Sequence, residues 1–147
     1  MAKKCNIIAV KVLGDSGQGS TATVMAGIQW AQKDAMTKGP KKCVSNSLPL
    51  NAKIVCGTDI GGKVANMSLG GGFSQVLNNT VAAAVRSGLT MMVAAGNDNK
   101  DAKGSSPASE PLAYTIGSID STDIKSSYSN FGKCTPPLHP ILLSPSV

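Results

Sequence analysis

The chain has 147 residues, which is enough for one domain of ordinary size. Hydrophobic residues make up 41% and charged residues 15%, a balance that permits a packed core and excludes wholesale disorder. Aromatic residues are only 3%, which excludes a surface that stacks nucleic-acid bases. The net charge is +6, but the lysines stand singly or in pairs, so we interpret them as a solvated surface and expect no nucleic-acid partner.

No apolar stretch reaches the roughly 18 residues of a membrane span, and the N-terminal residues lack the apolar core of a signal peptide. We therefore expect no membrane partner. The spacing of the four cysteines, Cys5, Cys43, Cys56 and Cys134, matches no zinc-binding pattern and selects no disulfide pairing.

The first predicted unit is a strand, a glycine loop and a helix. Residues 6–13 form a short β-branched run that is typical of a buried strand. A glycine-dense loop follows over residues 14–19, and Ser20 or Thr21 can cap a helix that ends before Gly39. The helix is indicated by apolar residues at helical spacing, Val24, Ile28, Ala31 and Ala35.

The second unit repeats this order. Residues 64–68 predict a strand, and Ser74 is the expected N-cap of a helix that ends at Gly88. Residues 89–95 are almost wholly apolar, so we expect a central parallel strand buried on both faces, and residues 112–119 predict one more strand. The helix carries one apolar stripe, Leu77, Val81 and Ala84. This alternation predicts an α/β fold, a mostly parallel sheet in three layers, with ligands at the carboxyl ends of the strands.

Two segments do not fit this alternation. Residues 44–63 have no helical or strand period of useful length and separate a finished helix from the strand that it should precede. Residues 133–147 hold four of the eight prolines, and we expect that they cannot extend a sheet.

One motif points weakly to nucleotide binding. Gly17-Gln-Gly19-Ser-Thr-Ala22 fits the glycine pattern that lets a pyrophosphate approach the backbone. That pattern also needs an acidic residue at the end of the next strand, whereas Asp34 falls inside the predicted helix. A nucleotide-binding α/β domain is therefore a remote alternative, and a turn that requires small residues is the favoured interpretation.

Three further motifs carry a stronger signal: Asn66-Met-Ser-Leu-Gly-Gly-Gly-Phe73, Met92-Val-Ala-Ala-Gly-Asn97 and Ser106-Pro-Ala-Ser-Glu-Pro111. In this order and spacing the chain resembles subtilisin-like serine proteases of the fungal proteinase K type. The likeness covers about residues 2–43 and 64–132. It implies a partial subtilisin-like fold and a secreted endopeptidase that acts on peptide or protein substrates.

The resemblance assigns roles to particular residues. It makes Asn97 the oxyanion-hole donor, a fixed neutral amide that bonds the charge developing in the transition state. The walls of the primary specificity pocket correspond to Ser68, Leu69, Gly70, Ala94, Ala95 and Gly96. The edge that binds substrate backbone corresponds to Gly17, Gly19 and Thr21.

The resemblance also implies a structural calcium ion but no required cofactor. Pro111 and Ala113 match its backbone-carbonyl ligands, whereas Pro136 stands near the position of the carboxylate that would complete the site.

Catalysis in this family needs aspartate, histidine and serine acting together. The resemblance places the first two motifs before Lys3 and the serine motif after Gly132, where Ser144 and Ser146 lie in a proline-rich context instead. His139 has none of the expected neighbours. The chain is thus predicted to be an inactive fragment of the protease; the alternative is a non-catalytic peptide-binding or interaction protein.

This interpretation divides the chain into a partial peptidase domain over 1–132, an insertion over 44–63 and a divergent tail over 133–147. We interpret the insertion as an intron translated in frame and expect it to be unpacked, and the tail as a second gene-model error. A slice of the fold should be marginally stable, with apolar residues such as Ile7, Ile8, Leu89, Met91 and Val93 partly unpaired.

Overall fold

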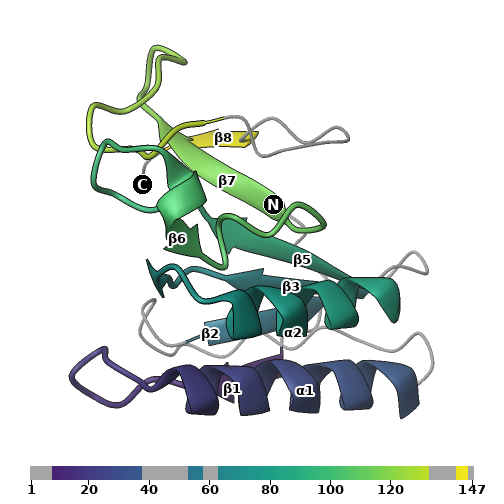
Figure 1. The fold of residues 1–147 in the computed structure, drawn as a ribbon. Helices are drawn as coiled ribbons and strands as arrows, with labels where there is room; N and C mark the ends of the chain where they lie inside the picture. The colour runs from purple at the N-terminus through teal and green to yellow at the C-terminus, as the bar shows by residue number, and fades with distance from the viewer. Residues whose placement is uncertain (1–7, 38–52, 58–62, 133–141, 146–147) are drawn as a thin grey trace.

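The computed structural model describes residues 8–37, 53–57, 63–132 and 142–145, with 53–57 and 142–145 described by their backbone (Figure 1). They form a six-stranded sheet in the order β1-β2-β3-β5-β7-β8 and a two-stranded ladder of β4 with β6. The strands are β1 (Ile8–Lys11), β2 (Lys53–Gly57), β3 (Lys63–Met67), β4 (Gly71–Gly72), β5 (Leu89–Ala94), β6 (Ser105–Ser106), β7 (Tyr114–Ile119) and β8 (Leu142–Pro145). The helices are α1 (Thr21–Thr37), α2 (Gln75–Arg86) and the 3₁₀ turn η2 (Ala102–Gly104).

The sheet is mostly parallel. Strands β3, β5, β7 and β8 pair in parallel, whereas β2 is antiparallel to both of its neighbours. Helices α1 and α2 lie side by side along one face (Figure 1). The predicted α/β class with flanking helices is confirmed.

Local sequence explains where each helix begins. The Ser20 hydroxyl accepts a hydrogen bond from the Thr23 backbone N–H at 3.1 Å, and the Ser74 hydroxyl accepts one from Leu77 at 3.3 Å. Each bond satisfies a backbone donor that a helix leaves unpaired at its start. Gly88, with φ +92°, follows the C-cap of α2 as predicted.

The core lies between the helices and one face of the sheet. It includes Val24, Ile28 and Ala31 from α1, Leu77, Val81 and Ala84 from α2, and Ala65, Met67, Leu89, Met91 and Val93 from β3 and β5. The expectation that Leu89, Met91 and Val93 would be partly unpaired is wrong, because α2 and the neighbouring strands bury them almost completely.

Two predictions of strand burial also need correction. In β5 only alternate residues are buried, and Thr90, Met92 and Ala94 on the other face are half-buried because no described helix covers them. Strand β1 was expected to be buried, but it is the edge of the sheet, with Ala9 and Lys11 exposed. An apolar run indicates that a segment tends to form a strand, but it does not indicate which other element will cover that strand.

The segment 44–63 contains a strand, contrary to the prediction. Lys53–Gly57 forms β2 between β1 and β3, so this part of the segment is not an unpacked excursion. Cys56 stands opposite Ile8 on one side and Ala65 on the other. The β-branched pair Ile54-Val55 is too short to show a period by itself, and the unpaired edges of β1 and β3 supply the hydrogen bonds that make it a strand.

The tail also extends the sheet, although we expected that it could not. Leu142–Pro145 forms β8 in parallel register with β7, with Pro145 opposite Ile119. β8 is the last strand of the described sheet, and an edge strand tolerates proline because one row of its backbone donors has no partner strand.

Candidate functional site

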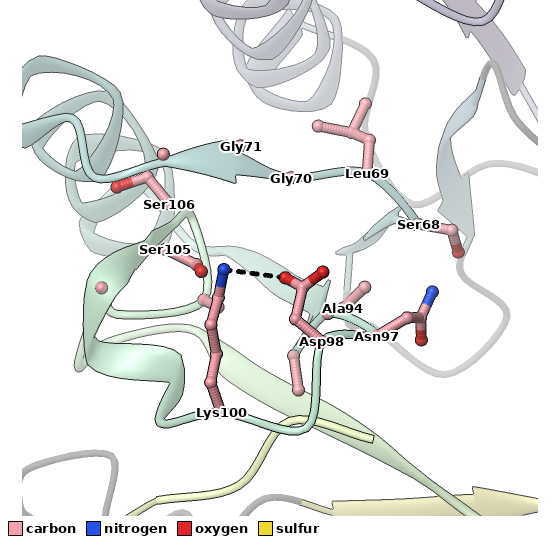
Figure 2. Close-up of a pocket in the computed structure, with 15 residues that line it drawn as sticks. Ser68, Leu69, Gly70, Gly71, Ala94, Asn97, Asp98, Lys100, Ser105 and Ser106 are labelled. Atoms are coloured by element: carbon pink, nitrogen blue, oxygen red, sulfur yellow. Dashed lines mark ion pairs between the residues drawn. The ribbon is translucent and has the colours of Figure 1, made fainter. Parts of the chain in front are cut away.

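Two segments that leave neighbouring parallel strands form the walls of the main hollow. Met67 near the end of β3 stands opposite Val93 in β5, so residues 68–72 and 94–98 start from the same edge of the sheet. With residues 104–106 they line a cavity of about 450 Å³ (Figure 2). The cavity brings together the predicted pocket walls and the predicted oxyanion donor, Ser68, Leu69, Gly70, Ala94, Ala95, Gly96 and Asn97.

The first wall is a glycine strand. Gly71 and Gly72 pair with Ser106 and Ser105 in the β4–β6 ladder. The buried Ser106 hydroxyl accepts from the Ser74 backbone N–H at 2.8 Å, which ties the ladder to the start of α2. A Cβ on Gly71 or Gly72 would meet no atom within 4 Å, so this wall presents bare backbone to the hollow.

The second wall ends in a turn that exposes Asn97. Gly96 takes φ +105°, a conformation that side chains disfavour, and thereby turns the chain out of the sheet. Figure 2 shows Asn97 and Ser68 at the same end of the main hollow. Among the described residues no group bonds the Asn97 carboxamide, so its N–H₂ is available to an oxygen that carries negative charge.

A second hollow, of about 490 Å³, lies on the other side of the glycine strand. It shares residues 68–72 with the main hollow and adds Gly17, Gly19 and Thr21, the predicted backbone-binding edge. All of the predicted substrate-binding residues therefore line one of two adjoining hollows.

The glycine motif of the remote nucleotide hypothesis has a packing explanation here. A Cβ on Gly19 would lie 2.6 Å from the Val12 carbonyl oxygen and 2.8 Å from a Leu13 methyl carbon. The Ser20 hydroxyl already caps the start of α1. The close approach of loop and strand thus requires glycine at position 19, and this explanation involves no phosphate.

The structure adds charged residues that the sequence analysis did not single out. The Lys100 ammonium lies 2.9 Å from the Asp98 carboxylate, and this exposed ion pair borders the main hollow (Figure 2). In the sequence, the only signal for these two residues is that they lie within three positions after Asn97. Ser105 and Ser106 belong to the same hollow, because the β4–β6 ladder brings them back to it.

The predicted calcium ligands lie away from both hollows. The Glu110 carboxylate beside them accepts a hydrogen bond from the Leu112 backbone N–H at 3.1 Å, and the Glu110 carbonyl oxygen accepts one from Ala113 at 3.2 Å. Pro136 lies outside the described residues, and within them no three acidic, histidine or cysteine side chains converge. The calcium site at Pro111 and Ala113 therefore stays a prediction from the resemblance, and no step below uses a metal.

No histidine stands beside Asn97 in the described part of the chain. The single histidine, His139, falls outside the described residues, as does Ser146, while Ser144 is described only by its backbone within β8. The two hollows provide surfaces, and the Asn97 side chain provides an amide donor to the main hollow. Among the described segments no helix is long and apolar enough to cross a membrane.

Comparison with known proteins agrees with this geometry. The chain matches the model of the subtilase family over residues 1–146. It is 47% identical to "Subtilisin-like protease 7" of Trichophyton violaceum over 133 residues, and 47% identical to "Subtilisin-like protease 3" of Arthroderma otae over 132 residues. Each match covers 90% of this chain and 28% of the relative, so the chain spans less than a third of these proteins.

A solved structure shares the fold. The crystal structure of a cold adapted subtilisin-like serine proteinase aligns with a TM-score of 0.69 and 38% identity. The alignment covers 91% of this chain and 38% of that one.

Proposed function

Since the chain belongs to the subtilase family, we propose that it forms the central part of the substrate cleft of a subtilisin-like serine endopeptidase. The observation that carries the proposal is the exposed Asn97 carboxamide, beside a hollow walled by residues 68–70 and 94–96. The substrate is a peptide or protein. By family resemblance the whole protease is secreted.

In this proposal the two hollows hold different parts of an extended peptide. The main hollow takes one side chain, because glycine and alanine walls leave room for it. The edge at Gly17, Gly19 and Thr21 binds the backbone before the cut. When a nucleophile attacks the peptide carbonyl, negative charge grows on its oxygen, and the Asn97 amide stabilises that charge more than the neutral carbonyl.

We further propose that the chain alone does not hydrolyse peptides. Nucleophilic attack by serine needs an adjacent base to take its proton, and the part of the chain that the structure describes contains no histidine. Purified chain incubated with a chromogenic peptide should release product no faster than buffer. Cleavage that a serine-reactive inhibitor abolishes would overturn this part of the proposal.

Peptide binding is the positive test. The chain should bind an extended peptide by calorimetry, and Gly70→Val, which places a bulky side chain in both hollows, should weaken that binding at least tenfold. Ala83→Val is a matched control, because Ala83 is exposed on α2 and lines neither hollow. A chain that binds no peptide would contradict the proposed cleft. If the chain binds peptide without hydrolysing it, and the transcript encodes no Asp/His/Ser triad, the non-catalytic alternative is favoured.

The origin of residues 44–63 and 133–147 stays a prediction. Strands β2 and β8 show that parts of both segments pair with the sheet, which says nothing about how the gene is spliced. A mature transcript that lacks the codons for 44–63 would support the intron interpretation. A message that always retains them would refute it.

A further inference from the structure

Asn130 packs against the turn that follows β5 and is only 1% exposed. Its carboxamide oxygen accepts hydrogen bonds from the backbone N–H groups of Asp98, at 2.9 Å, and Lys100, at 3.1 Å. Its carboxamide nitrogen donates to the Ala95 carbonyl oxygen at 2.9 Å, and its backbone N–H donates to the Gly96 carbonyl oxygen at 3.0 Å. One side chain thus holds backbone groups on both sides of the turn.

The Gly96 position shows how closely Asn130 approaches this turn. A Cβ on Gly96 would lie 2.4 Å from the Asn130 carboxamide nitrogen, a distance that real Cβ atoms do not reach. Gly96 is therefore needed for two reasons, its φ of +105° and the space that Asn130 occupies. The turn and the asparagine beneath it form one packed unit.

The chain segment that carries Asn130 is itself tied to the turn. The Asn99 backbone N–H donates to the Tyr128 carbonyl oxygen at 2.8 Å, and Phe131 donates to Lys100 at 3.0 Å. The Lys125 ammonium donates to the Asn99 side-chain oxygen at 3.1 Å and to the Ser129 carbonyl oxygen at 3.0 Å. The segment that carries Asn130 is therefore fixed to the turn by its own hydrogen bonds, in addition to those of the Asn130 side chain.

An exposed turn without such bonds would sample several backbone conformations, and each would aim the amide of Asn97 differently. Stabilisation of developing charge depends on a donor that is already in place, because reorientation during the reaction costs free energy. We propose that Asn130 is a positioning residue that fixes the direction of the Asn97 carboxamide. The inference rests on the proposed function of Asn97 as donor to an oxyanion.

Hydrogen exchange of the unmodified chain gives the first test. The amide protons of Asp98 and Lys100 should exchange slowly although both residues are exposed, because Asn130 accepts from them. The Asn97 amide proton in the same turn is the internal control and should exchange quickly. Equal, rapid exchange of all three protons would overturn the proposal.

Two peptides of one sequence give the second test, one ending in a free carboxylate and one in a primary amide. A carboxylate oxygen in the main hollow resembles the oxyanion, and a hydrogen bond to a charged group should favour the carboxylate peptide about tenfold. Asn97→Ala and Asn130→Ala should both bring this ratio close to one, while the affinity for the amide peptide changes less than twofold. A purely structural defect would lower both affinities together.

Asn79→Ala is the matched control, since Asn79 is an exposed asparagine on α2 whose side chain bonds only Gln75 among the described residues. It should keep the tenfold ratio. A folded Asn130→Ala chain that keeps the ratio would refute the proposal, and if this variant does not fold, the exchange experiment decides. If the unmodified chain binds neither peptide, the proposed function fails, whereas slow exchange at Asp98 and Lys100 still supports Asn130 as the residue that fixes the turn.

Discussion

The two walls of the main hollow are built in opposite ways. The turn over residues 95–100 is held by the buried Asn130, which makes four hydrogen bonds to its backbone. The strand over residues 70–72 is held by a two-residue ladder and has open space around Gly71 and Gly72. One wall is a fixed polar support for an amide donor, and the other is an exposed backbone edge. The difference teaches that the proposed charge-binding and peptide-binding walls obey separate structural demands.

Matched glycine substitutions should give the largest contrast between the walls. Gly96→Ala forces a side chain into a left-handed conformation and against Asn130, so it should lower the free energy of unfolding by about 3 kcal/mol. Gly71→Ala meets no atom and should change it by less than about 0.5 kcal/mol. Urea denaturation of both variants measures the difference. Similar losses at the two sites would refute the contrast.

Removal of the Ser106 hydroxyl should have the next largest effect. Ser106 is completely buried and bonds the Ser74 backbone N–H, so Ser106→Ala leaves that donor unpaired at a cost of about 1.5 kcal/mol. The loss should loosen the glycine wall and leave the Asn97 turn unchanged. Amide exchange should therefore accelerate at Ser74 and remain slow at Asp98. Faster exchange in both places would show that the walls are coupled.

Removal of the Asp98–Lys100 ion pair should alter binding more than stability. The pair is more than half exposed, so Lys100→Ala should change the unfolding free energy by less than about 0.5 kcal/mol. It leaves the Asp98 carboxylate without its partner at the border of the main hollow. Peptides with a basic side chain should then bind about threefold more tightly at low salt, and the gain should shrink at high salt. A gain that is independent of salt would contradict this account.

The smallest effect should come from Asp120, which shapes the segment that carries Asn130. Its carboxylate accepts hydrogen bonds from the Thr122 hydroxyl and the backbone N–H groups of Thr122 and Ile124, and these lower its pKa below the ordinary 3.8. The charged form is favoured in the folded chain, so this stabilisation is present above pH 3.8 and is lost as pH falls through the lowered pKa. Asp120→Asn should therefore reduce the loss of thermal stability at acid pH, as measured by the unfolding temperature across a series of pH values.

Asp123→Asn serves as the control for that profile, because Asp123 lies in the same loop with φ +63°, a conformation that asparagine tolerates. An acid limb that is identical in all three proteins would rule out a contribution from Asp120.

The sequence by itself determined the helices and their buried faces. The apolar stripe of Val24, Ile28 and Ala31, and that of Leu77, Val81 and Ala84, predicted both helices, and Ser20 and Ser74 marked their starts. These features depend on residues within one or two turns of each other, so a local pattern describes them completely. The motifs around Asn66, Asn97 and Ser106 likewise sufficed to predict the family, which the comparisons confirmed.

Only the tertiary structure decided which strands have neighbours and what covers them. Strand β2 forms because β1 and β3 offer unpaired edges, and Leu89, Met91 and Val93 are buried because α2 lies over them. The same holds for the Asn97 turn, whose support comes from Asn130 across thirty or more residues of sequence. Hydrogen bonds and burial depend on distance in space, and a sequence pattern carries no information about a partner that the fold brings from far along the chain.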